Sequence, residues 1–168
     1  TSGFYLGGGY PELHAQKVSE NNAVRGAIHR AVEDGMPVLA ECGGFLYLQN
    51  SLEDAEKQSW PMAGALEGRG FRTERLQRFG YVTLTAREDT PYLKRGETIA
   101  AHEFHRWDCT ENGRVCEAVR PVGGERWPCM VARKNLLGGF PHLYFPSNPQ
   151  LAVRFVSACG VYQERMTR

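Results

Sequence analysis

The chain has 168 residues, the size of one globular domain, and its 42% hydrophobic composition can supply one sizeable core. Its 20 basic and 19 acidic residues nearly cancel, which argues against the strongly basic surface that dominates nucleic-acid binding. Five scattered cysteines fit a reducing compartment, and the apolar runs are too short to cross a membrane. We therefore expect a cytoplasmic, soluble domain over 1–168 that binds neither nucleic acid nor membrane.

The first elements predicted along the chain alternate between strand and helix. Residues 1–6 read as a strand that begins without a cap or turn, as if the chain started inside a larger protein. Apolar residues recur at helical spacing over 19–35, after serine and asparagine capping candidates. Residues 36–40 form a continuous apolar run, typical of a strand buried on both faces of a parallel sheet. This order predicts a right-handed crossover unit.

The rest of the chain is predicted to be richer in strands. A helical pattern restarts over 45–48, residues 81–85 alternate at period two, and 99–104 is another strand candidate. Between 130 and 145, two strand-like pieces flank the glycine pair at 138 and 139. Asn148 and Pro149 predict the start of a last helix, as N-cap and first-turn proline. Its expected buried face consists of Leu151, Ala152, Phe155, Val156 and Cys159.

Cys42 stands at the predicted turn between a strand and a helix, in Ala40-Glu41-Cys42-Gly43-Gly44. Such a turn projects the sulfur away from the sheet, and the helix N-terminus favours the thiolate. The glycines leave room for a substrate, and the next backbone N–H can face a developing oxyanion. The pattern therefore suits a nucleophile, although a buried structural cysteine is the commoner fate of a single cysteine.

A second glycine-rich segment, Gly7-Gly8-Gly9-Tyr10-Pro11-Glu12, also follows a predicted strand. Such a loop can present backbone N–H groups to an anion. It could equally be a phosphate-binding loop or an ordinary turn, although the chain has no Gly-x-x-x-x-Gly-Lys-Ser/Thr motif. The loop alone does not decide between these interpretations.

Two further segments, His102-Glu103-Phe104-His105 and Pro141-His142-Leu143-Tyr144-Phe145, follow these two in order. Together the four resemble the carboxy-terminal glutamine amidotransferase domain of cobyrinic acid a,c-diamide synthase, over nearly the whole chain. The resemblance implies an α/β fold, the flavodoxin-like sandwich of class I glutamine amidotransferases. A mostly parallel central sheet is expected, here without the first elements of the fold.

The resemblance also implies the chemistry of the site. Cys42 would be the nucleophile that forms a glutamyl thioester and releases ammonia, and His142 would be the base. Gly8 or Gly9, together with Gly43, would supply N–H groups to the oxyanion. Further candidates beside the site, without an assigned role, are Tyr10, Glu12, Glu41, Gly44, His102, Glu103 and His105.

One position departs from the wider amidotransferase pattern. Many members carry a carboxylate two residues after the histidine, where it orients the ring, but this chain has Tyr144 there. The cobyrinate-type branch also lacks the acid and usually has histidine at that position. A Cys–His dyad is therefore predicted. His102 and His105 could be structural or could bind a metal, but with Cys109 and Cys116 they lack the spacing of strong zinc motifs, so no metal site is expected.

For the intact enzyme, the resemblance implies an amino-terminal synthetase domain, absent from this chain, that uses ATP and Mg²⁺. That domain would activate the a and c carboxylates of cobyrinic acid in cobalamin biosynthesis. This domain would need no cofactor, and its partners would be glutamine, the corrinoid acceptor through the synthetase domain, and a second copy in a homodimer. The alternatives are a cobyric acid synthase-type amidotransferase, a non-catalytic amidotransferase-like binding module, and another hydrolase with the same turn.

Overall fold

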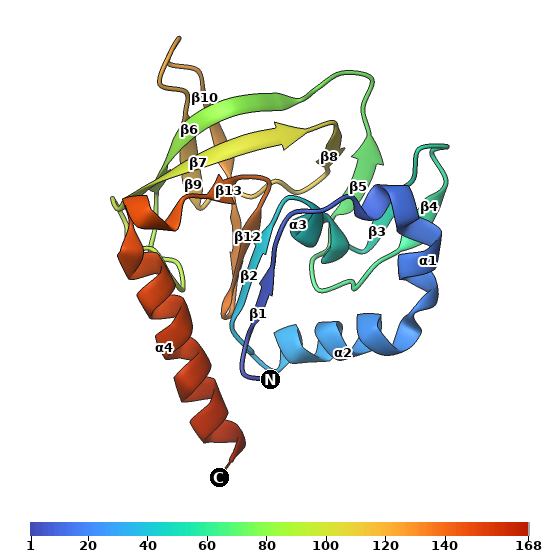
Figure 1. Cartoon of the computed structure of the whole chain (residues 1–168), viewed down its shortest axis with the longest axis horizontal. Coiled ribbons are helices and arrows are strands. Elements are labelled where there is room, and N and C mark those ends of the chain that lie inside the picture. The colour runs from blue at the N-terminus through green and yellow to red at the C-terminus, as the bar shows by residue number, and fades with distance from the viewer. Residues whose placement is uncertain (168) are drawn as a thin grey trace.

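The computed structural model describes residues 1–167, in which a parallel sheet forms the centre of the molecule (Figure 1). This sheet has the strand order β1-β2-β12-β11, and β11 is its antiparallel edge. The other pairs, β1 with β2 and β2 with β12, are parallel. The four strands are β1 (Phe4–Leu6), β2 (Val38–Glu41), β12 (Leu136–Gly139) and β11 (Val131–Arg133). The strands expected over 1–6 and 36–40 and the parallel central sheet are thus confirmed.

Helices cover both faces of this sheet, as Figure 1 shows, with α2 on one side and α4 on the other. The helical elements are η1 (Pro11–His14), α1 (Ala15–Glu20), α2 (Asn22–Glu33), α3 (Gly43–Tyr47), η2 (Phe145–Ser147) and α4 (Pro149–Met166). Successive side chains of β2 enter different cores, because a strand alternates its faces. Val38 packs in a cluster with Ile28 of α2, whereas Leu39 packs in a cluster with Leu151 of α4. Among the described residues, no helix is long and apolar enough to span a membrane.

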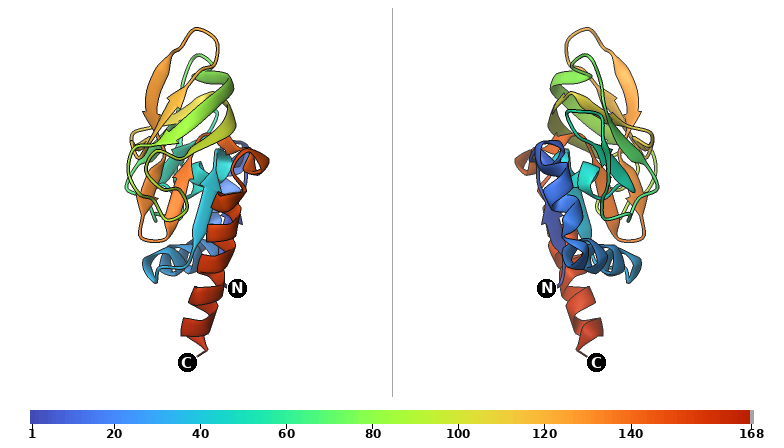
Figure 2. Two further views of the ribbon diagram at one scale, coloured as in Figure 1. Left: turned by 90° about the vertical axis from the view of Figure 1, so that its left-hand side faces the viewer. Right: turned by 90° about the vertical axis from the view of Figure 1, so that its right-hand side faces the viewer.

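A second, antiparallel sheet lies beside the parallel one and gives the middle of the chain its β-rich character (Figure 2). Its strand order is β10-β9-β6-β7-β13, and it confirms the strands expected around 81–85 and 99–104. Its strands are β10 (Arg126–Cys129), β9 (Cys116–Val119), β6 (Arg78–Ala86), β7 (Thr98–His105) and β13 (His142–Leu143). Only Phe140 and Pro141 separate β12 in the first sheet from β13 in the second, so the chain changes sheets there.

A third sheet, in the order β4-β3-β5-β8, completes the fold. Its strands are β4 (Ser59–Pro61), β3 (Ser51–Glu53), β5 (Arg69–Arg72) and β8 (Trp107–Cys109). β8 follows β7 after the single residue Arg106, so the second and third sheets share one stretch of chain.

The segment with Gly138 and Gly139 is a strand, so the prediction that it separates two strands was wrong. It forms β12, which pairs with β2 on one side and β11 on the other. Glycine usually weakens a strand, but close packing requires it here. A Cβ atom on Gly139 would lie 2.4 Å from the sulfur of Met130. The strand was not predicted because glycine, which usually weakens a strand, is required here by close packing.

The predicted starts of two helices are confirmed, but the asparagine before each helix acts differently. Asn21 caps α2, because its side-chain oxygen accepts a hydrogen bond from the Val24 N–H at 3.2 Å. Asn148 precedes Pro149 at the start of α4, but its side-chain amide donates to the Thr98 carbonyl at 3.0 Å instead. This asparagine therefore ties α4 to β7 and does not cap the helix with its side chain.

One member of the expected buried face of α4 was wrong. Val156 is 66% exposed, whereas Leu151 is fully buried and Tyr162, which was not predicted, is 6% exposed. At 100° per residue, Val156 lies about 140° around the helix from Leu151. Leu151, Phe155 and Tyr162 follow the helical period and face the core.

Replacing Leu151 and Val156, one at a time, tests which face of α4 is buried. Leu151→Ala should lower the free energy of unfolding by about 2–5 kcal/mol, since it leaves a cavity. Val156→Ala, the matched control on the same helix, should change it by less than about 0.5 kcal/mol. Urea denaturation followed by circular dichroism measures both. Equal losses for the two variants would contradict this packing.

Candidate active site

Cys42 occupies a strained turn between β2 and α3. Its backbone has φ 47° and ψ −107°, a conformation that residues other than glycine rarely adopt. The turn is fixed on both sides, because the Cys42 N–H donates to the Gly139 carbonyl at 2.8 Å and the Cys42 carbonyl accepts from the Leu46 N–H at 2.9 Å. This is the geometry of a nucleophile elbow, in which a strained turn exposes the reactive side chain.

The glycine loop after β1 packs directly against this turn. The Gly44 N–H donates to the Gly7 carbonyl at 3.1 Å, and a Cβ atom on Gly43 would lie 2.3 Å from the Gly9 carbonyl oxygen. A Cβ atom on Gly8 would lie 2.5 Å from the imidazole of His142. The two glycine-rich motifs and the histidine therefore meet in one place. Only glycine fits at position 43, and a side chain at position 8 would displace the ring of His142.

Three backbone N–H groups at this contact are candidates for binding a ligand. Within residues 1–167, those of Gly8, Gly9 and Gly43 form none of the main-chain hydrogen bonds of the turns and loops. These are the groups predicted to bind the oxyanion, and their role stays a prediction.

His142 stands beside Cys42 and is half-buried, with 37% of its side chain exposed. Strand β13 carries it, and β13 pairs with β7 so that His142 lies opposite His102. The pKa of His142 is raised to about 10, first by the neighbouring Cys42 and then by Glu41, while burial acts in the opposite direction. An imidazolium beside a thiol favours the thiolate. The structure thus brings together the two residues predicted to be nucleophile and base.

Glu41, next to the cysteine in sequence, is buried beneath His142. Its Oε2 atom lies 3.4 Å from Nδ1 of His142 and accepts a hydrogen bond from the Tyr5 hydroxyl at 2.9 Å. Its Oε1 atom accepts from the Leu143 N–H at 3.1 Å. Burial, followed by the charge of Glu41 and the hydrogen bond to it, raises the pKa of Tyr5 to about 12. Each oxygen of this buried carboxylate therefore accepts a hydrogen bond.

A cavity of about 210 Å³ opens in front of Cys42. Three of the candidates beside the site, Tyr10, Glu12 and His105, line it. The other lining residues are Gly9, Leu13, Cys42, Leu46, Phe104, Arg106 and Trp107. Arg106 and Trp107 were missed from the sequence, although they directly follow the His102-Glu103-Phe104-His105 segment. Extending that motif by two residues would have found them.

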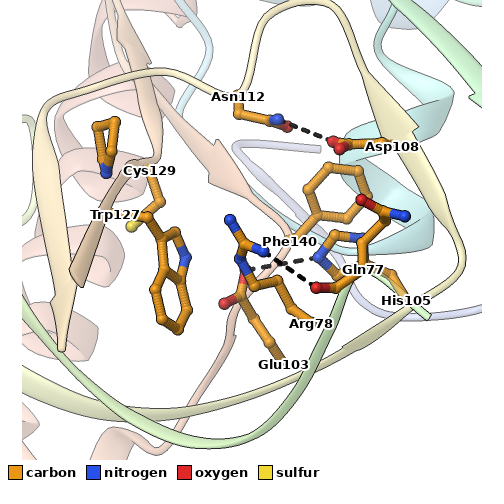
Figure 3. Close-up of a pocket in the computed structure, with 10 residues that line it drawn as sticks. Gln77, Arg78, Glu103, His105, Asp108, Asn112, Trp127, Cys129 and Phe140 are labelled. Carbon is orange, nitrogen blue, oxygen red and sulfur yellow. Dashed lines mark hydrogen bonds and ion pairs between the residues drawn. The ribbon is translucent and has the colours of Figure 1, made fainter. Parts of the chain in front are cut away.

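The alternation of β7 sends the residues of this segment to opposite faces. His102 lies on the outer face, with ring centroids 5.3 Å from Tyr81 and 6.1 Å from Phe79. Glu103 and His105 are buried on the inner face, where they line a second cavity of about 50 Å³ (Figure 3). His102 and Glu103 therefore lie outside the cavity that contains Cys42.

His105 forms part of the wall between the two cavities. Its Nδ1 atom hydrogen-bonds the Trp107 carbonyl at 2.7 Å, and its ring stacks on Phe140 at 3.8 Å. Its Nε2 atom points toward Glu103, 3.6 Å from Oε1 (Figure 3). In residues 1–167, no three histidine, cysteine, aspartate or glutamate side chains cluster as metal ligands would. These contacts indicate that His105 has a structural role in the wall between the two cavities.

The comparison with known families decides what kind of domain this is. Residues 1–150 match the family described as the CobB/CobQ-like glutamine amidotransferase domain. The chain belongs to this family. The resemblance stated from the four sequence motifs is therefore confirmed.

Curated relatives of this amidotransferase domain are much longer than the chain. Cobyrinate a,c-diamide synthase of Caldanaerobacter subterraneus subsp. tengcongensis is 38% identical over 164 residues, which cover 96% of this chain and 36% of the relative. The enzyme of the same name from Picrophilus torridus is 35% identical, over 94% of this chain and 34% of the relative. The chain thus spans about a third of the length of these relatives.

Solved structures share the fold of the amidotransferase domain. PurLQS from Thermotoga maritima matches with a TM-score of 0.58 at 17% identity, covering 95% of this chain and 79% of that chain. A glutamine amidotransferase from Thermotoga maritima matches with a TM-score of 0.53 at 13% identity, covering 97% of this chain and 64% of that chain. These likenesses confirm the predicted amidotransferase fold.

The five free thiols of the domain should differ sharply in reactivity. Burial raises the pKa of Cys109 and Cys116 to about 12 and also raises that of Cys129 and Cys159, so these thiols stay protonated at neutral pH. A glutamine-mimicking electrophile should label Cys42 at least roughly tenfold faster than the others, because only Cys42 lies beside an imidazolium. Mass spectrometry after a timed reaction measures the labelling. Preferential labelling of Cys159, which is also partly exposed, would contradict the prediction.

Proposed function

We propose that this amidotransferase domain hydrolyses glutamine at Cys42 and supplies the ammonia for ATP-dependent amidation of the a and c carboxylates of cobyrinic acid. The observation that carries the proposal is the meeting of three parts at one place: the strained turn of Cys42, the glycine loop that packs against it, and His142 beside that loop. Cys42 and Glu41 raise the pKa of His142 to about 10. The names of the curated relatives support the acceptor. This arrangement also favours catalysis over a non-catalytic binding module.

In the first half of the reaction, the Cys42 thiolate attacks the side-chain amide carbon of glutamine. A carbon–sulfur bond forms, and the carbonyl electron pair moves to the oxygen. When this tetrahedral intermediate collapses, the carbon–nitrogen bond breaks. His142 gives its proton to the departing nitrogen, so that ammonia leaves and a glutamyl thioester remains.

In the second half, water hydrolyses the thioester. His142, now neutral, accepts a proton from the attacking water, and a second oxyanion forms and collapses. The carbon–sulfur bond breaks, so that glutamate leaves and the thiolate and imidazolium are restored. The backbone N–H groups of Gly8, Gly9 and Gly43 would stabilise both oxyanions, because fixed donors need no reorganisation during the reaction.

The cavity beside Cys42 has features that suit an amino acid. Arg106 and Glu12 line it, and they can offer groups of opposite charge to a substrate with both an ammonium and a carboxylate group. Its volume of about 210 Å³ falls below the roughly 300–1,000 Å³ of pockets for drug-sized ligands. A small metabolite such as glutamine fits this combination.

An aromatic patch on the outer face of β6 and β7 supports the proposal that a partner protein binds beside this site. It consists of Phe79, Tyr81, His102 and Phe104, whose three apolar members are 60%, 76% and 44% exposed, respectively. Phe104 also lines the cavity of Cys42, and Tyr81, His102 and His142 lie in one row across the strands. Exposed aromatic residues are typical of the centre of protein interfaces. We assign the patch to docking of the ATP-dependent synthetase unit.

The position of this patch suits the delivery of ammonia, the product of glutamine hydrolysis, to its acceptor. Ammonia that escapes into water at neutral pH is largely protonated and loses its nucleophilicity, so the acceptor should be brought to the mouth of the cavity. The synthetase unit would correspond to the remaining two thirds of the relatives' length. It would hold ATP and Mg²⁺, while this domain needs no cofactor. The five free thiols accord with a cytoplasmic location.

Cys42→Ser separates ammonia production from ammonia use. In the assembled synthase, this variant should lose at least ~10³-fold in glutamine-dependent amidation, because serine lacks the activated thiolate. Amidation with added ammonium salt should be unchanged, since the synthetase unit does not use Cys42. Diamide formation with each nitrogen source, followed by chromatography, measures both activities. Equal loss of both would refute the proposal, and equal retention would favour a non-catalytic module.

Variants of the aromatic patch test its role in docking. A Phe79→Ser and Tyr81→Ser double variant should raise the ratio of glutamate formed to amide formed by at least roughly tenfold, because aromatic anchors carry much interface energy. Val122→Ser is the matched control, since Val122 is 83% exposed and outside the patch. Ammonia-dependent amidation should stay at the wild-type rate. An unchanged ratio in the double variant, or the same rise in the control, would contradict this assignment.

A further inference from the structure

The amidotransferase pattern calls for an acid two residues after the histidine, but that position cannot supply one here. Tyr144 follows at that spacing, and it is 60% exposed. Its backbone N–H donates to the Ala100 carbonyl, which holds this part of the chain on β7. The imidazole of His142 must therefore be oriented by another group or by none.

Glu41 occupies the place where such a group would act. We propose that Glu41 is the positioning residue of this site, which holds Nδ1 of His142 and thereby directs Nε2 toward Cys42. The observation is the 3.4 Å separation between Oε2 of Glu41 and Nδ1 of His142, on a carboxylate whose side chain is 3% exposed. The inference rests on the proposed function and deepens it. The carboxylate comes from the residue before the nucleophile and not from the residue two after the base.

The surroundings of Glu41 favour this role over simple packing. Its carboxylate accepts hydrogen bonds from the Tyr5 hydroxyl and the Leu143 N–H, one on each oxygen. These two bonds fix the plane of the carboxylate, and Oε2 lies 3.4 Å from Nδ1 of the imidazole. A carboxylate placed in this way selects the tautomer with a proton on Nδ1 and stabilises the imidazolium.

The sheet arrangement explains how a residue beside the cysteine can reach the histidine. Glu41 is the last residue of β2 and lies in register with Gly139, the last residue of β12. His142 follows three residues later, after the chain has crossed to the second sheet. The short crossing folds His142 back over the end of β2. Glycine at 139 permits this close crossing, because a Cβ atom there would lie 2.4 Å from the sulfur of Met130 and 3.3 Å from Pro141.

Other titratable groups near His142 provide no competing acid. Cys42 is its partner on the α3 side, Tyr5 of β1 donates to Glu41, and His102 lies opposite it on β7. Two groups raise the pKa of His142, Cys42 first and Glu41 second, and Glu41 is the carboxylate of the two. Glu41 is therefore the carboxylate on which the orientation of the ring depends.

The decisive variant is Glu41→Gln, which keeps the size of the side chain and removes its charge. NMR titration of His142 in the isolated chain should show a pKa near 10 in the wild type and a fall of about 1–3 pH units in the variant. Because a lower pKa removes the imidazolium earlier, the alkaline limb of Cys42 labelling should move down by the same amount. In the assembled synthase, kcat for glutamine should fall by ~10²- to 10⁴-fold with little change in KM.

Two controls separate positioning from structural support. Tyr5→Phe removes a hydrogen bond to the carboxylate but keeps its charge, so the His142 pKa should stay within about 0.5 pH units of wild type. Glu103→Gln removes another carboxylate that is 3% exposed but that faces the second cavity, and it should leave the His142 pKa unchanged. Circular dichroism checks that each variant is folded.

The outcomes are distinguishable from a failure of the proposed function. An unchanged His142 pKa and an unmoved labelling profile in folded Glu41→Gln would overturn the inference, even if Cys42→Ser still abolished glutamine use. A similar pKa fall in Glu103→Gln would also overturn it, because the effect would then be general to buried charge. If Cys42→Ser left glutamine use intact, the proposed function itself would fail, whatever the NMR titration showed.

Discussion

The buried carboxylate of Glu41 joins the two main sheets of this domain. It belongs to β2 of the parallel sheet and accepts hydrogen bonds from Tyr5 of β1 and from the backbone of β13 in the antiparallel sheet. A carboxylate without partners would be costly at 3% exposure, so these contacts are needed to stabilise the buried charge in the folded domain. The arrangement of the candidate site is therefore part of what holds the fold together, and not an addition to it.

The site also follows from the position of three strand ends. The glycine loop follows β1, Cys42 follows β2, and His142 comes shortly after β12, so all lie at the carboxyl edge of one parallel sheet. Ligands of open α/β sheets bind at this edge, because the loops that leave parallel strands meet there. Segments more than 130 residues apart in the chain become neighbours in this way. The antiparallel sheet then supplies the far wall of the cavity, through Phe104 and His105.

The sequence predicted the elements whose signals are local and missed what depends on contacts between distant residues. Periodicity located β6, β7 and most of α4, and the strand-to-helix turn at Cys42 was visible in the order of its residues. Glu41 was recognised as a neighbour of the site, but its contact with His142 spans 101 residues of chain and no spacing rule reveals it. The strand at Gly138 and Gly139 was missed because its glycines are required by close packing, against Phe45 and Ala40 at 138 and against Met130 at 139. Val156 was misplaced because an apolar residue need not face the core.

The strained backbone of Cys42 has a consequence for how domains of this fold can diverge. The unfavourable φ of 47° is imposed by hydrogen bonds to Gly139 and Leu46, which involve only main-chain atoms. Another side chain at position 42 would meet the same strain and the same main-chain contacts. The main-chain shape of the turn therefore does not depend on the cysteine side chain that would carry the chemistry. A single codon change at position 42 could turn a glutamine-hydrolysing ancestor into a binding protein with the same fold.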